Sequence, residues 1–158
     1  MVRAASDLAV VVADQFGVVG VNGVDFIARA GVPYPIEVNP RWCGSMEVVE
    51  HAYGISMFDV HASACEAGRL PRFELGRARQ GGAAGKAIVF ARQDVVIGDT
   101  TPWLSDTTVR DVPHPGERIP SGRPVCTVFA TAPHAAGCYA ALVSRARHIY
   151  VQVAEWQR

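Results

Sequence analysis

Polar side chains alternate along one short segment of the sequence, Glu37-Val38-Asn39-Pro40-Arg41. Successive residues of a β-strand point to opposite faces, so Glu37 and Asn39 share one face if the segment is extended, and Arg41 comes next on that face. Carboxylate and carboxamide oxygens suit Mg²⁺ or Mn²⁺, while a planar guanidinium suits a phosphate or a carboxylate. The spacing therefore indicates a divalent cation site with an anion-binding arginine beside it.

These side chains must be positioned by a β-hairpin. Two segments rich in β-branched and aromatic residues flank a loop that contains glycine and proline (residues 23–28, 34–39 and 29–33). If the hairpin folds symmetrically about Gly31, Asp25 lies opposite Glu37. Two facing carboxylates repel each other, and a shared cation removes that repulsion. We therefore predict Asp25, Glu37 and Asn39 as metal ligands.

An exposed face of an edge hairpin explains the same pattern without any ligand. Arg41 would then pair with one of the two acids. The ligand-type spacing and the following Pro40 favour a site, but the periodicity by itself leaves both interpretations open.

Composition and charge narrow the classes of partner. The 158 residues are enough for one domain, or for one domain and a small lobe, and a hydrophobic fraction of 49% is typical of a globular protein. The formal net charge of +0 argues against a nucleic-acid-binding surface. No apolar run approaches the ~20 residues of a membrane span, and the four cysteines form no C-x-x-C pair. We expect a soluble, cytoplasmic protein without a nucleic-acid or membrane partner.

The predicted fold class is α+β. Apolar periodicity and capping residues predict helices over Val2–Phe16, Ser45–Tyr53 and Met57–Ala67, with Ser56 as an N-cap and Gly17, Gly54 and Gly68 as C-caps. We expect a first domain over residues 1–72, a linker over 73–85 and a small, mainly β lobe over 86–158.

In that lobe, strands are expected near Lys86–Arg92 and Val125–Ala130, with a short one near Val95–Ile97. The chain closes either with a helix over residues 134–152 or with a strand over 149–153.

The motif set resembles a known family. "GVDFI" followed by "PIEVNPR" is similar to the C-terminal half of the ATP-grasp fold, whose members carry an acidic residue on one strand and E-x-N-x-R on the next. The continuation "NPRWCGSMEVVEHAYGISMFDVHASACEAGRLP" resembles predicted ATP-dependent carboligases related to biotin carboxylase. "GKAIVFA" and "DVPHPGERIPSGRPVCTVFA" resemble, more loosely, the small C-terminal lobe of such enzymes. The resemblance implies an antiparallel sheet with flanking helices, and ATP with Mg²⁺ or Mn²⁺ as cofactors.

The resemblance also implies roles for the motif residues. Asp25, Glu37 and Asn39 would be metal ligands, with Glu37 bridging two ions, and Arg41 would be the catalytic residue that contacts the transferred phosphoryl group. The implied reaction activates a small carboxylate as an acyl-phosphate, which an amine or a similar nucleophile then attacks.

Five further residues are weaker candidates. Asn22 in "GVVGVNG" could reach the metal or phosphate region as a cofactor contact. Gly44 and Ser45 could offer backbone N–H groups to a substrate, and Glu47 and His51, at i and i+4, could contact it. Simple capping and a solvated helical face explain the last four equally well.

The resemblance covers only part of an ATP-grasp enzyme. No glycine-rich phosphate loop precedes the hairpin, and the single lysine, Lys86, lies beyond it. The chain is then a portion of a longer protein, one half completed by a partner chain, or a relic without turnover. The alternative function is a non-catalytic binding or assembly module that works by self-association, such as a homodimer.

Overall fold

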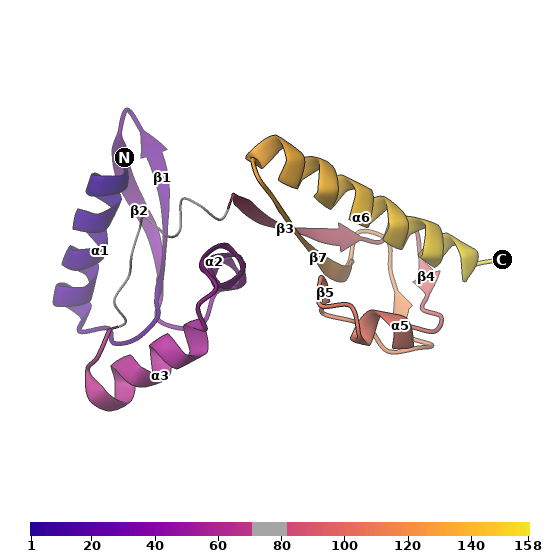
Figure 1. Cartoon of the computed structure of the whole chain (residues 1–158), viewed down its shortest axis with the longest axis horizontal. Helices are drawn as coiled ribbons and strands as arrows, with labels where there is room; N and C mark the ends of the chain where they lie inside the picture. The colour runs from indigo at the N-terminus through magenta and orange to yellow at the C-terminus, as the bar shows by residue number, and fades with distance from the viewer. Residues whose placement is uncertain (71–81) are drawn as a thin grey trace. The chain divides into compact units, whose positions relative to one another are not determined.

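The structure is a computed structural model that describes residues 1–70 and 82–158. The chain divides into two compact units, unit 1 (Met1–Leu75) and unit 2 (Gly76–Arg158), shown in Figure 1. The described residues are mixed α and β with antiparallel sheets, so the predicted α+β class is confirmed. No helix in these two ranges is both long and apolar enough to cross a membrane.

Unit 1 is built on a helix and a hairpin. Helix α1 (Val2–Phe16) has the predicted bounds and ends at Gly17, whose left-handed backbone (φ 59°) stops the helix. Strands β1 (Gly23–Arg29) and β2 (Val32–Asn39) pair antiparallel, and α1 packs along β2 (Figure 1).

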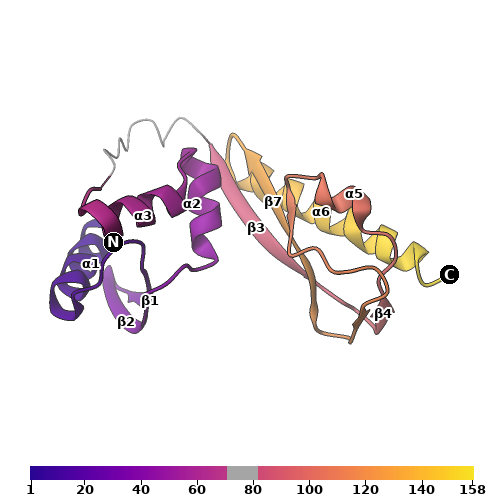
Figure 2. The ribbon, with the colours of Figure 1, turned by 90° about the horizontal axis from the view of Figure 1, so that it is seen from below.

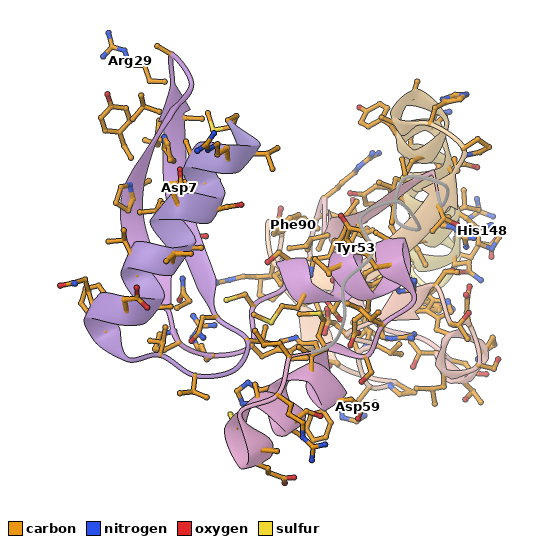
Figure 3. The ribbon with its side chains drawn as sticks, turned by 60° about the vertical axis from the view of Figure 1, so that its left-hand side comes forward. Asp7, Arg29, Tyr53, Asp59, Phe90 and His148 are labelled. Atoms are coloured by element: carbon orange, nitrogen blue, oxygen red, sulfur yellow. The ribbon has the colours of Figure 1, made fainter. Side chains whose placement is uncertain are left out.

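The hairpin loop is shorter than predicted. It consists of Ala30 and Gly31 alone, both with positive φ (49° and 81°), which matches the twist of the two strands. Arg29 therefore ends β1 at the tip of the hairpin (Figure 3) instead of lying in a five-residue loop.

Helices α2 (Ser45–Tyr53) and α3 (Met57–Ala67) also have the predicted bounds. The Ser56 hydroxyl accepts a hydrogen bond from the Asp59 N–H and so caps α3 as expected. Gly54 and Gly68 are left-handed C-caps.

Unit 2 is a three-stranded antiparallel sheet covered by a long helix. The sheet order is β3 (Ala83–Phe90), β7 (Pro124–Ala132) and β5 (Val109–Arg110), and α6 (Ala135–Glu155) lies along β3 and β7 (Figure 2). Two short strands, β4 (Val95–Val96) and β6 (Arg118–Ile119), pair beside it, and α5 (Thr101–Leu104) is a single turn. Residues 125–130 are all buried, because this central strand is covered on both faces.

Two expectations for this part of the chain are corrected, and the choice between a closing helix and a closing strand is resolved. Strand β3 begins at Ala83, so Ala83–Gly85 pair with β7 instead of forming the end of a linker; residues 73–81 lie outside the described residues. The chain closes with a helix, because Ile149 and Val153 are buried one turn apart on the face that meets the sheet. With this 21-residue helix the lobe is mixed rather than mainly β.

The buried core is unequal between the units. Unit 2 holds a continuous cluster around Val89, Ile97 and Val128. Trp103 packs at a tilt against Trp156 beside it, with 5.3 Å between the ring centroids. In unit 1 the buried hydrophobic residues, within the described range, are Val12, Met46 and Ala64. Unit 1 therefore leaves many apolar side chains exposed.

Candidate functional site

The base of the hairpin brings the predicted carboxylates together. Asp25 is paired with Glu37 in the ladder, and Gly23 with Asn39. Paired residues share a face of the sheet, so Asp25, Glu37 and Asn39 lie on one face, and the predicted pairing is confirmed. Both carboxylates are exposed to solvent.

Asn39 links an acid to an arginine. Its side chain is buried (8% exposed); Nδ2 donates to Asp25 Oδ2 at 3.4 Å, and Oδ1 accepts from Arg41 Nη2 at 2.9 Å. Arg41 Nη1 also donates to the Trp42 carbonyl at 3.1 Å. Within the described residues the Arg41 guanidinium pairs with neither carboxylate, so the ion pair of the alternative interpretation is not formed.

A close approach at Gly23 holds in place the loop of residues 40–44 that carries Arg41, here called the arginine loop. A Cβ at position 23 would lie 2.6 Å from Cys43 Sγ, and that thiol contacts the Arg41 carbonyl at 3.4 Å. The Cys43 N–H contacts Sδ of the buried Met46 at 3.2 Å, which ties the loop to α2. Sequence reasoning missed this contact; a glycine at the first position of a strand was its one available signal.

The entry to β1 is held by a histidine. His61 Nδ1, on α3, accepts from the Val21 N–H at 3.0 Å, and its ring lies where a Cβ at Gly20 would be. The candidate Asn22 donates to the Gly20 carbonyl at 2.9 Å and lines a cavity between α1 and α3 together with Val24. Since neighbouring strand residues alternate faces, this is the face opposite Asp25. The structure therefore does not bring Asn22 to the face of the hairpin that carries Asp25 and Glu37.

The four candidates on α2 lie near its two ends. Gly44 is the N-cap without a side-chain cap, Ser45 is the first helical residue, Glu47 is half-buried in the first turn and His51 lies in the last turn. None of them takes part in the interactions of Asp25, Asn39 and Arg41. Their neighbour Glu50 accepts from the Met57 N–H at 2.8 Å and so supports the start of α3.

The oxygen atoms on the hairpin face could provide only part of the coordination shell of a cation, and waters or phosphate oxygens would supply the rest. Asp25 and Glu37 offer two carboxylates, whereas the Asn39 oxygen already accepts from Arg41. Within the described residues no three His, Cys, Asp or Glu side chains come together as a metal site. Mg²⁺ is commonly bound by one or two carboxylates with waters and substrate phosphates completing the shell, and that arrangement suits this face.

The chain resembles known proteins in sequence over its first residues and in structure over most of its length. Residues 1–45, which include Asp25, Glu37, Asn39 and Arg41, match the model of the ATP-grasp domain family. No curated protein matches the sequence.

Two solved structures share the fold at low sequence identity. One is a pyruvate carboxylase from Rhizobium etli with the allosteric activator acetyl coenzyme A (TM-score 0.61, 20% identity, 87% of this chain and 14% of that one). The other is the biotin carboxylase domain of a thermophilic 2-oxoglutarate carboxylase bound to bicarbonate (TM-score 0.58, 19% identity, 90% of this chain and 34% of that one). This chain thus spans about a third or less of the length of either. Residues 1–45 therefore carry an ATP-grasp segment, and the chain as a whole has a fold related to that of biotin carboxylase.

Proposed function

We propose that unit 1 is the metal- and phosphate-binding half of an ATP-grasp ligase that activates a small carboxylate as an acyl-phosphate. One observation carries the proposal: Asp25, Asn39 and Arg41 are hydrogen-bonded in series, with Glu37 facing Asp25 across the ladder. All four residues fall within the ATP-grasp match.

Each side chain has a separate task in this proposal. Asp25 and Glu37 would hold Mg²⁺ or Mn²⁺, which would neutralise phosphate charge when bound. Asn39 fixes the Arg41 guanidinium through the 2.9 Å contact and leaves its other donors for a phosphate oxygen. As the substrate carboxylate attacks the γ-phosphorus and ADP leaves, the Arg41 guanidinium stabilises the negative charge that develops on the transferred phosphoryl group. An amine or a similar nucleophile then displaces phosphate from the acyl-phosphate.

The cation can bind without disturbing the arginine. Its arrival at Asp25 would replace the 3.4 Å contact from Asn39, which is long for a hydrogen bond. The shorter contact between Asn39 and Arg41 stays in place.

The substrate and the rest of the active site lie beyond this unit. The 2-oxoglutarate carboxylase domain was solved with bicarbonate, which favours a small carboxylate or bicarbonate as the acid that is activated here. Because this chain spans 34% of that domain, we propose that further protein, in the same chain or in a partner chain, supplies the remaining ATP contacts.

Mn²⁺ binding tests the site. Electron paramagnetic resonance titration of Mn²⁺ with ATP should show weak binding to the wild-type chain. Asp25→Asn and Glu37→Gln should each weaken that binding at least about tenfold, because each removes one of two carboxylates. Asp7→Asn is the matched control, since Asp7 is an exposed carboxylate on α1 (Figure 3). Equal Mn²⁺ binding by wild type, Asp25→Asn and Glu37→Gln would exclude the site.

A second candidate function, self-association without catalysis, is favoured by the apolar surface of unit 1. Large hydrophobic side chains are exposed on α1 and on the hairpin, among them Val10 (59%), Phe16 (70%), Ile27 (62%) and Ile36 (66%). An accumulation of large exposed apolar side chains is typical of protein interfaces. Light scattering separates the two functions: a stable dimer that ignores Mg-ATP supports assembly, and a monomer that binds Mn-ATP supports the ligase half.

A further inference from the structure

Unit 2 contains an apolar cavity of about 210 Å³, which we call the α6 pocket. Four valines from β3, β4, β7 and α6 form the inner part of its lining, namely Val89, Val95, Val125 and Val153. Each of these side chains is less than 8% exposed, so the wall belongs to the core of the unit. The volume is that of about seven water molecules, which suits a short aliphatic chain.

An arginine stacked on a tyrosine stands at the rim of this pocket. Arg92 Cζ lies 3.9 Å from the centroid of the Tyr150 ring, and the Tyr150 hydroxyl donates to the carbonyl of Phe90 (Figure 3) at 3.1 Å. The hydrogen bond fixes the ring, and the ring in turn fixes the plane of the guanidinium. Both residues line the cavity, and Arg92 is exposed whereas the four valines are buried, so the guanidinium lies on the solvent side of the pocket.

The donors at the rim are open to an anion. In the described part of the chain the Arg92 guanidinium makes neither a hydrogen bond nor an ion pair, and no acidic residue lines the pocket. The backbone N–H groups of Arg92 and Gln93 donate to no acceptor within the same residues. A planar guanidinium with free N–H groups matches a carboxylate.

The far wall of the pocket is held rigidly. Gln157 Oε1 accepts from the Val96 N–H at 3.0 Å, and its Nε2 donates to the Val96 carbonyl at 2.8 Å. The end of α6 is thereby fastened to β4, and the cavity between them is formed before any ligand arrives. Preformed sites bind at lower entropic cost than sites that must order.

We propose that the α6 pocket binds a short aliphatic monocarboxylate, with its tail among the valines and its carboxylate on Arg92. A stacked arginine alone is common on protein surfaces and would indicate no ligand. Here it coincides with an apolar cavity, open donors and a lining without acids, and a molecule with one apolar and one anionic end satisfies all of these features. The pocket lies in unit 2 and involves none of the residues of the hairpin face, so its failure would leave the proposed ligase function standing.

A chain-length series tests the proposal on the full chain. Titrations of acetate, butyrate, hexanoate and octanoate, followed by ¹H–¹⁵N NMR at constant ionic strength, should shift the resonances of Gln93 and Ala154, which line the pocket. Affinity should rise about fourfold for each added methylene up to octanoate, whose seven tail carbons are about what the cavity can hold. Affinity independent of chain length would overturn the proposal.

Three variants separate the charge from the cavity. Hexanoate should bind the wild-type chain at least about tenfold more tightly than hexanol, and Arg92→Gln should abolish this preference. Ala154→Leu should weaken both ligands, because Ala154 lines the cavity and is itself exposed. Arg147→Gln, which removes an exposed arginine of α6 outside the pocket, should leave both affinities unchanged. If Arg92→Gln keeps the wild-type preference for hexanoate, the pocket is not a carboxylate site.

Discussion

Gly23→Ala should loosen the base of the hairpin, because Cys43 Sγ occupies the space that a Cβ would need. The Cβ would lie 2.6 Å from that sulfur, about 1 Å inside a normal contact, whereas its next neighbours, at 3.5 and 3.6 Å, are unstrained. Overpacking of this kind costs about 1–3 kcal/mol. The lower entropy of alanine in the unfolded chain offsets about 0.4–1 kcal/mol, since no positive φ is required at Gly23. We expect a net destabilisation of about 1–2 kcal/mol.

Cys43→Ala removes the sulfur that Gly23→Ala would contact, so the destabilising effect of Gly23→Ala should disappear in that background. In that background Gly23→Ala should be neutral or stabilising, which gives a coupling energy of about 1–3 kcal/mol between the two positions. Amide hydrogen exchange, read by mass spectrometry on peptides of β1 and β2, isolates unit 1 from the unfolding of unit 2. Exchange in the Gly23→Ala variant should be about 5-fold to 30-fold faster than in wild type, since 1.4 kcal/mol corresponds to about a factor of ten. If the effect of Gly23→Ala is the same with and without Cys43, the close contact does not hold the loop.

Three further predictions concern unit 2. Hydrogen bonds from the side chain and the backbone N–H of Thr108 lower the pKa of the Asp106 carboxyl group. The ionised carboxylate therefore stabilises the fold above its ordinary pKa of 3.8, and this stabilisation is lost as the pH falls through the lowered pKa. In urea titrations Asp106→Asn should lower the free energy of unfolding by about 0.5–1 kcal/mol at neutral pH, and the stability of the variant should depend less on acid than that of wild type. Burial raises the pKa of Cys126 to about 12, so iodoacetamide at pH 8 should label the exposed Cys65 in the native chain and Cys126 only after unfolding, as peptide mass mapping would show. Gly98→Ala places a Cβ against the Trp156 ring and should cost about 1–3 kcal/mol with a shift in tryptophan emission; an unchanged denaturation midpoint would contradict the packing.

The sequence predicted the pairing of Asp25 with Glu37 correctly, although it predicted the wrong hairpin loop. The prediction placed the centre of symmetry at Gly31, whereas the loop is Ala30-Gly31 and the strands pair around a point half a residue earlier. A bulge between Asp25 and Phe26 then adds one residue on β2 and restores the pairing of Asp25 with Glu37. The alternation of polar and apolar residues and the residues of the loop can be recognised in a sequence. A β-bulge that shifts the strand register by one residue cannot be predicted in this way.

Helix bounds in unit 1 were predictable for a local reason. Each of the three helices ends at a glycine in the left-handed conformation, and Ser56 caps α3 by a hydrogen bond within three residues. In unit 2 the determinants are long-range: Ala83 to Gly85 form a strand because β7 offers partners at Thr131 and its neighbours, although their own composition is that of a loop.

The glycines of "GVVGVNG" show why the polar residues of the hairpin face could be placed from the sequence, whereas the contacts that hold them could not. A cluster of glycines can indicate a phosphate-binding loop, yet each of these glycines has its own structural cause. Gly17 ends α1, Gly20 (φ 79°) gives its space to His61 from α3, and Gly23 gives its space to Cys43 beyond β2. Two of the three causes lie 20 to 41 residues away in the chain and exist only once α3 and the arginine loop have folded back on β1. The polar residues of the hairpin face can therefore be recognised from the local sequence pattern. The position of that face depends on Gly20 and Gly23, which contact residues far away in the sequence.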